Sequence, residues 1–150
     1  MKKLSLIILL IFTLFLSGCG GSKTKKMECT LEKEADFKLT AKYTVEYEGK
    51  YVKSIRFYEE YISDDKDTLD TIQKQVETIY NGVNEKYGGY TIDIKNDGNK
   101  VVADVIVNYN KFNISLWAKD NSSLNSFVED GKILLSAIKK QYDSAGLTCK

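Results

Sequence analysis

Apolar and polar residues alternate most strongly between Phe37 and Glu48, where Phe, Leu, Ala, Tyr and Val occupy every second position. Successive side chains of a strand point to opposite faces, so this pattern predicts a strand with one buried and one solvated face. Gly49 suits a tight turn, and residues 51–61 predict a return strand on whose apolar face Glu59 is an interruption. Together these residues predict an antiparallel β-hairpin.

The spacing of apolar residues changes to three and four after the acidic segment 63–67. Short acidic side chains cap the free amides at a helix N-terminus and complement its dipole. Helical spacing from Leu69 to Tyr87 predicts an amphipathic helix that ends at Gly88 and Gly89. A calcium loop is the alternative for the acidic segment, but the segment lacks the central glycine and distal glutamate of an EF-hand.

Two further strands and one earlier strand are predicted by the same alternation. Residues 90–95 and 101–109 alternate on either side of a turn at residues 96–99, which indicates a second hairpin. Residues 27–33 form a short candidate strand that carries Cys29.

The C-terminal third has a weaker pattern. Residues 111–117 alternate as a strand would, but a structured crossover is equally compatible with them. Residues 120–128 predict a short capped helical turn, and residues 133–144 predict a final helix that ends before Gly146. The last residues, 147–149, are expected to return to the first strand.

These elements predict an α+β fold. We expect an antiparallel sheet of four to five strands, with two main helices packed on one face, in a single domain over residues 27–150. An N-terminal signal helix is expected to precede it.

The first nineteen residues have the order of parts found in a secretory signal peptide. Lys2 and Lys3 precede an apolar run, residues 4–16, which is shorter than a membrane span. The run ends in Leu16-Ser17-Gly18-Cys19.

This tetrad resembles the lipobox of bacterial lipoproteins. The resemblance implies cleavage between Gly18 and Cys19, and a diacylglyceryl thioether on Cys19 that anchors the chain to the cell membrane. Residues 1–18 would then be a lipoprotein signal peptide and residues 19–26 a lipidated flexible tether on the extracytoplasmic side of the envelope. An ordinary secretory peptide with an incidental cysteine is the alternative.

Composition narrows the classes of function. Removal of residues 1–18 takes Lys2 and Lys3 with it, which leaves 20 basic against 21 acidic residues, so no strong field would attract nucleic acid. The chain has no histidine, which excludes Ser-His-Asp and Cys-His catalysis and removes the commonest metal ligand. We expect no cofactor and no metal site.

Two cysteines remain beside Cys19. Cys29 and Cys149 lie at opposite ends of the predicted domain, and an extracytoplasmic compartment permits their oxidation to a disulfide. Two reduced buried thiols are the alternative, and a zinc site would need carboxylates to complete its ligands.

The predicted domain is similar to a known group. The lipobox, the segment Tyr43–Val52, the helix and the second hairpin together resemble the small uncharacterised YehR-type lipoproteins. The resemblance covers residues 37–110 and does not extend to the Cys29–Cys149 pair. It implies no catalytic residue and no ligand.

The sequence thus favours a membrane-anchored, non-catalytic module that binds a protein, an envelope polymer or a small ligand through its sheet or a crevice between helix and sheet. A histidine-independent envelope enzyme is an alternative, although no Gly-x-Ser-x-Gly elbow or phosphate-binding glycine loop supports it. A solute-binding lipoprotein is another alternative, but such proteins commonly need two lobes. Ten tyrosines and Trp117 leave a carbohydrate-binding platform as an alternative, but most tyrosines fall on predicted apolar faces, which favours core packing. Tyr58 is the best candidate for an exposed aromatic.

Overall fold

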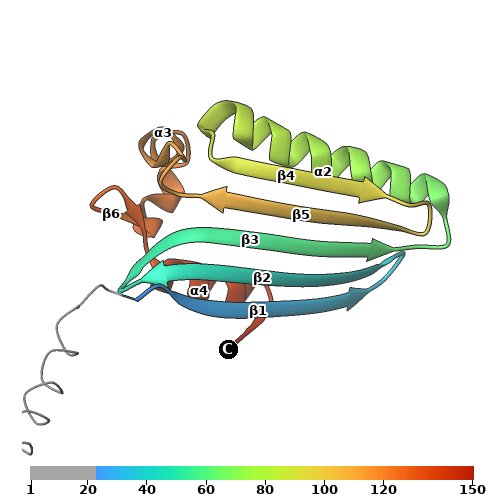
Figure 1. Cartoon of the computed structure of the whole chain (residues 1–150), viewed down its shortest axis with the longest axis horizontal. Helices are drawn as coiled ribbons and strands as arrows, with labels where there is room; N and C mark the ends of the chain where they lie inside the picture. Colours follow the sequence, from blue (N-terminus) through green and yellow to red (C-terminus); the bar gives the residue numbers. More distant parts are fainter. Residues whose placement is uncertain (1–22) are drawn as a thin grey trace, which may run out of the picture.

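The computed structural model describes residues 23–150. The expected N-terminal signal helix therefore lies outside the described residues. A single antiparallel sheet runs the length of the domain, with two long helices behind it and a small hairpin at one end (Figure 1). The α+β class is confirmed.

The sheet has six strands in the order β4-β5-β3-β2-β1-β8. Their bounds are β1 Lys25–Glu34, β2 Lys38–Glu48, β3 Tyr51–Ile62, β4 Tyr90–Asn96, β5 Lys100–Asn108 and β8 Thr148–Cys149. The remaining elements are α2 Lys66–Tyr87, α3 Ile114–Asp120, the 3-10 helix η1 Ser122–Phe127, β6 Val128–Glu129, β7 Lys132–Ile133 and α4 Leu135–Ser144.

Both predicted hairpins are confirmed, and the expected strand count is too low. Tyr43 lies opposite Phe57, and Phe57 lies opposite Val105, so three neighbouring strands direct apolar side chains to the same face. The sixth strand is β8, which pairs Cys149 with Cys29 as the expected return to the first strand requires. A strand of two residues is too short to show any alternation, so a pattern of period two cannot reveal it.

The first strand begins earlier than its apolar pattern indicates. Lys25 and Lys26, which we assigned to the tether, pair with Tyr47 and Glu46 of β2. Strand β1 therefore starts at the end of the domain that carries the β2–β3 turn (Figure 1). Two exposed lysines at a strand end carry no hydrophobic signal, so only the pairing partner defines this boundary.

Helix α2 begins and ends as its sequence predicts. Asp65 is the N-cap, and its carboxylate accepts hydrogen bonds from the amides of Asp67 and Thr68. The prediction that the acidic segment caps a helix is confirmed. At the other end Gly89 has a φ of +83°, and a Cβ there would lie 2.9 Å from the Phe112 nitrogen, so both conformation and space require glycine.

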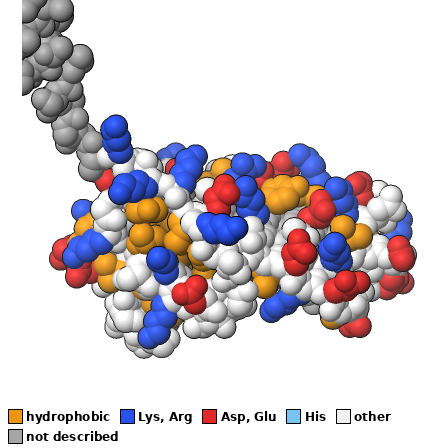
Figure 2. Space-filling model, turned by 90° about the horizontal axis from the view of Figure 1, so that it is seen from below, with side chains coloured by type: hydrophobic (Ala, Val, Ile, Leu, Met, Phe, Trp, Pro, Cys, Tyr) orange, Lys and Arg blue, Asp and Glu red, His pale blue; other side chains and the backbone are white. Residues whose placement is uncertain are grey.

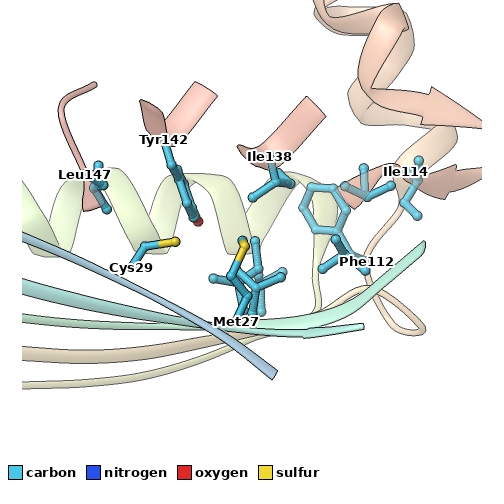
Figure 3. Close-up of a cluster of buried hydrophobic side chains, with 12 residues drawn as sticks. Met27, Cys29, Phe112, Ile114, Ile138, Tyr142 and Leu147 are labelled. Atoms are coloured by element: carbon cyan, nitrogen blue, oxygen red, sulfur yellow. The ribbon is translucent and has the colours of Figure 1, made fainter. Parts of the chain in front are cut away.

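The two long helices cover different halves of one sheet face, as predicted. Helix α2 buries Ile72 and Val76 against β5, in a cluster with Ala103 and Val105. Helix α4 lies over β1 and β2, where Ile138 and Tyr142 join a second cluster (Figure 3). The labelled members of that cluster are Met27, Cys29, Phe112, Ile114, Ile138, Tyr142 and Leu147.

The C-terminal third departs from its predicted bounds. The ambiguous segment 111–117 contains the start of α3, because the Asn113 side chain caps the helix by accepting a hydrogen bond from the Leu116 amide. Helix α4 begins at Leu135 rather than at residue 133. Leu134 is its N-cap, and Ile133 belongs to the β6–β7 hairpin, whose turn residues Asp130 and Gly131 both have positive φ.

Charges of both signs are interspersed on the surface. Seen from below, hydrophobic side chains gather in the left half of the domain, and Lys, Asp and Glu side chains are scattered over the whole face (Figure 2). This face thus presents no extended field of one sign.

Candidate functional site

The predicted site residues fall into two groups. Gly18 and Cys19 lie outside the described residues. Cys29 and Cys149 form a disulfide, as predicted, and they are directly opposite each other on β1 and β8. Cys29 is fully buried in the cluster beneath α4, which makes the bond a structural link rather than a reactive centre.

The apolar face contains one buried carboxylate, that of Glu59 on β3, which is 7% exposed. The Tyr43 hydroxyl donates to Glu59 Oε1 at 2.6 Å, and the Tyr61 hydroxyl donates to Oε2 at 2.7 Å. The Tyr80 hydroxyl reaches Oε1 from α2 at 3.5 Å. Glu59, which interrupts the apolar face in the sequence, is therefore the acceptor of a hydrogen-bonded polar cluster between sheet and helix.

The Glu59 cluster is suited to stabilising the contact between sheet and helix rather than to catalysis. Burial, followed by the charge of Glu59, raises the pKa of Tyr43 and of Tyr61 well above the usual value for tyrosine. These phenols stay protonated and serve as hydrogen-bond donors. Glu59 lines none of the five main depressions of the described surface.

Replacing Glu59 by Gln should destabilise the domain by about 1–3 kcal/mol, because the amide offers one acceptor oxygen where two phenols donate, and it buries an NH2 group. The matched control is Glu60→Gln on the solvent side of the same strand, where the lost contact is a partly exposed ion pair with Lys100. That variant should cost less than about 1 kcal/mol. Urea unfolding followed by circular dichroism compares the two, and equal midpoints would contradict the role given to Glu59.

The opposite face of the sheet is left uncovered by the helices in the described part of the chain. We call it the open face, and it consists of the outward side chains of β1 to β5. Its members are mostly charged or hydroxylated, and Ile62 and Val102 are apolar exceptions beside Ile106; they include Lys26, Glu28, Thr30, Glu32, Thr40, Lys42, Thr44, Glu46, Ser54, Arg56, Tyr58, Glu60, Thr91, Asp93, Lys95, Lys100, Asp104 and Ile106.

A depression of about 470 Å³ lies in the open face, a volume within the range of small-molecule sites. We call it the trough. Thr44 and Ser54 have short side chains and lie between longer ones, which explains the hollow. The trough is lined by Lys26, Glu28, Lys42, Thr44, Glu46, Ser54, Arg56, Tyr58 and Ile106.

Two exposed hydrophobic side chains lie in the trough. Tyr58 is 37% exposed and Ile106 is 39% exposed. Arg56 pairs with Ile106, and Tyr58 pairs with Asp104, so the aromatic ring and the aliphatic chain are diagonal neighbours across β3 and β5. Tyr58 is therefore exposed, as its position in the sequence predicted.

Ion pairs flank these two residues on the open face. They join neighbouring strands or neighbouring positions of one strand, and each has at least one partner that is 40% exposed or more, so they contribute little to stability. The pairs are Lys26–Glu46, Lys42–Glu28, Arg56–Asp104, Lys95–Asp93 and Lys100–Glu60. Their effect is that the charges of the open face are neutralised within the protein.

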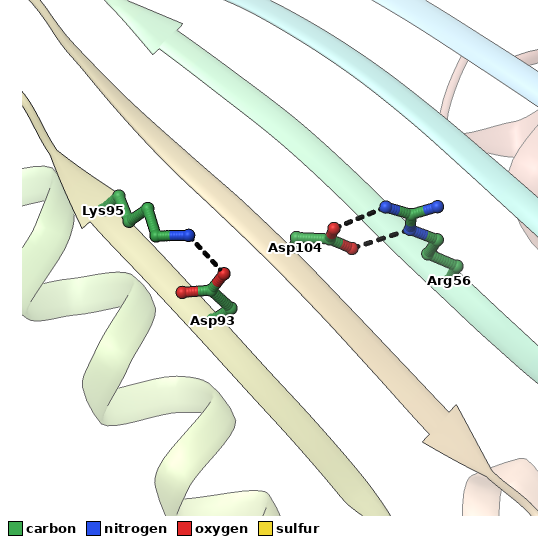
Figure 4. Close-up of polar contacts among 4 residues, drawn as sticks. All are labelled: Arg56, Asp93, Lys95 and Asp104. Carbon is green, nitrogen blue, oxygen red and sulfur yellow. Dashed lines mark hydrogen bonds and ion pairs between the residues drawn. The ribbon is translucent and has the colours of Figure 1, made fainter.

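The pair with the most defined geometry is Arg56–Asp104 (Figure 4). Arg56 Nε donates to Oδ1 of Asp104 at 2.7 Å, and Nη2 donates to Oδ2 at 2.5 Å. The guanidinium and the carboxylate therefore form a bidentate pair, which we call the fork. These hydrogen bonds lower the pKa of Asp104 below its usual range. The fork is a flat polar group with a fixed orientation beside Ile106.

Sequence reasoning did not identify this arrangement. The alternation predicts which residues point outward, but the partner of Arg56 depends on the register between β3 and β5, which are far apart in the chain. A bulge between Glu46 and Tyr47 also shifts the register at the end of β2 and places Glu46 opposite Ser54. The Ser54 hydroxyl then donates to Glu46 at 2.9 Å and is the main reason why the pKa of Glu46 is lowered.

Other chemistries find little support in the described residues. Within residues 23–150 no group of three or more Cys, Asp or Glu is arranged to hold a metal ion. Ser136 and Lys139 have Ser-x-x-Lys spacing on α4, but both are exposed and neither lines a depression found on the described surface. Among these residues no helix is long and apolar enough to span a bilayer.

Comparison with known proteins establishes a shared fold. No protein-family model matches the chain, and no curated protein matches it. An NMR structure of a protein from Streptococcus pneumoniae TIGR4 aligns with a TM-score of 0.56 at 13% identity, over 90% of each chain. The NMR structure of the E. coli YehR protein aligns with a TM-score of 0.59 at 13% identity, over 86% of this chain and 92% of that one.

These neighbours agree with the YehR resemblance found in the sequence, at the level of fold. At this identity the likeness extends to the arrangement of strands and helices and not to activity.

Proposed function

We propose that the chain is a lipoprotein precursor whose mature domain is held to the extracytoplasmic side of a bacterial membrane by a lipid on Cys19. We propose further that it acts there without catalysis, as a binding module that uses the open face. The observation that carries the binding half is the trough, which combines an exposed aromatic, an aliphatic side chain and oriented polar groups on an uncovered sheet.

The anchoring half rests on Leu16-Ser17-Gly18-Cys19 and on the short distance to the domain. Five residues, Gly20 to Thr24, separate Cys19 from the start of β1. Even fully extended they reach about 18 Å, so the end of the domain with the β2–β3 turn would lie near the membrane.

The same geometry would leave the open face accessible. The strands lead away from the tethered end (Figure 1), and the longest, β3, has 12 residues. At about 3.3 Å per residue the sheet extends about 40 Å. The open face would therefore lie side-on to the membrane and be exposed to soluble partners and envelope polymers.

Replacing Cys19 by Ala should release the protein from the membrane fraction, because no acyl chain can then be attached. Detergent phase partitioning of fractionated cells measures the change. The matched control is the double variant Cys29→Ala/Cys149→Ala, which keeps Cys19 and should stay in the detergent phase. A Cys19→Ala chain that still partitions into detergent would refute the anchor.

The released Cys19→Ala chain also tests the binding half. A muramidase digest of cell envelope is titrated into the labelled protein, and amide shifts are followed by NMR. Shifts concentrated on the strands of the open face would support the proposal. Shifts confined to α2 and α4, or an unchanged spectrum, would oppose it.

A further inference from the structure

We propose that the trough is a subsite for an uncharged polysaccharide strand. This inference rests on the proposed use of the open face for binding, and it specifies the chemistry of the ligand.

Charge is the first argument. Each cation that lines the trough has a carboxylate partner: Lys26–Glu46 and Lys42–Glu28 lie within the lining, and Arg56 pairs with Asp104 next to it. A polyanion or polycation would have to break these pairs to form its own, and like charges would oppose it. A neutral ligand leaves every pair intact. The balance of charge thus favours an uncharged partner.

Hydrogen-bonding capacity is the second argument. The trough presents the Thr44 hydroxyl, which can donate and accept, and the Ser54 hydroxyl, which donates to Glu46 and can still accept, next to carboxylate acceptors and guanidinium and ammonium donors. A ligand that matches this mixture must itself donate and accept at closely spaced points. Sugar hydroxyls do both, whereas hydrocarbon or lipid chains do neither.

Shape and stacking are the third argument. The trough is open to solvent rather than enclosed, so a chain longer than the trough can cross it. Tyr58 offers a partly exposed ring, and Ile106 extends the apolar surface beside it. An aromatic ring with polar groups around it binds the apolar face of a flat ring by stacking, while the surrounding groups fix the orientation. A pyranose ring has such an apolar face and a polar rim.

The test uses the mature Cys19→Ala chain with its disulfide intact, titrated with chitohexaose and with cellohexaose by NMR. We expect a neutral hexasaccharide to shift the amides of β3 and β5 around Tyr58 and Ile106. Tyr58→Ala should weaken binding on the order of 30-fold, the loss typical of a removed aromatic hot spot. Ile79→Ala is the matched control, since Ile79 is 61% exposed but lies on α2, away from the open face, and affinity should not change.

Several results would overturn the inference. Binding of a sulfated hexasaccharide but of neither neutral one would contradict the charge argument. Binding that Tyr58→Ala does not weaken would place the glycan elsewhere. If neither neutral glycan binds while the envelope digest still shifts the open face, the polysaccharide inference fails and the binding module stands. If the digest leaves that face unchanged as well, both fail.

Discussion

Reduction of the Cys29–Cys149 disulfide should lower the free energy of unfolding by roughly 4–5 kcal/mol, which would make it the largest single contribution that we expect. The bond links residues separated by 120 positions. In the chain-entropy model a loop of this length restricts the unfolded chain far more than the folded one. Comparing oxidised and reduced wild type leaves every side-chain volume unchanged, so the measured difference belongs to the cross-link.

Urea unfolding with and without reductant measures this difference. The double variant Cys29→Ala/Cys149→Ala is the control, because reductant should not alter its unfolding midpoint. If oxidised and reduced wild type unfold at the same urea concentration, the disulfide does not contribute as expected. Domains commonly unfold with a free energy of about 5–15 kcal/mol, so a loss of this size would remove a large share of the stability.

Raising the pH above 10 should unfold the domain in one step that coincides with ionisation of its buried tyrosines. Burial raises the pKa of Tyr90 to about 12. Burial raises the pKa of five others further, reinforced by Glu59 or by neighbouring tyrosines: Tyr43, Tyr61, Tyr80, Tyr109 and Tyr142.

The sign of this pH dependence follows from proton binding. An unfolded tyrosine ionises near pH 10, whereas a folded one with a raised pKa keeps its proton. Between these two pKa values the folded state binds more protons, so the free energy of unfolding falls as pH rises. Each such tyrosine contributes about 1.4 kcal/mol per pH unit, and several act together. Stability is therefore fully present below pH 10 and is lost above it.

Tyrosinate absorbance and far-ultraviolet circular dichroism, followed in one alkaline titration, test this prediction. The major absorbance step should coincide with loss of secondary structure. Tyr90→Phe should release about one proton fewer in that step. Complete tyrosine ionisation in a domain that keeps its circular dichroism would contradict the prediction.

The local elements of this fold could be predicted because each has a local cause. The period of two in β2 and β3, the acidic N-cap of α2 and the paired glycines after it all act within a few residues. Asn113 and the Asp130-Gly131 turn act in the same way, and both were missed although their chemistry was visible in the sequence. Asn at an N-cap is a recognisable signal of a helix start, and Asp-Gly is a recognisable signal of a hairpin turn.

The remaining features depend on contacts that no local pattern contains. Glu59 was recognisable as an exception on an apolar face, but its donors come from β2, from β3 and from α2. The Arg56–Asp104 fork depends in the same way on which residues meet across the β3–β5 pair. The alternation of apolar and polar residues predicts on which face of the sheet a side chain lies. Strand register and helix position decide which residues it contacts.

The pairing of β1 with β8 also has a consequence for the order of folding. Cys29 meets Cys149 at the far end of the chain, and α4, which covers β1 and β2, lies just before that cysteine. A chain threaded outward from its N-terminus cannot cover that half of its core until nearly the last residue has emerged. Contacts of such long sequence separation also form slowly. In the exported chain that we propose, this topology would delay closure of that half of the core until translocation is nearly complete.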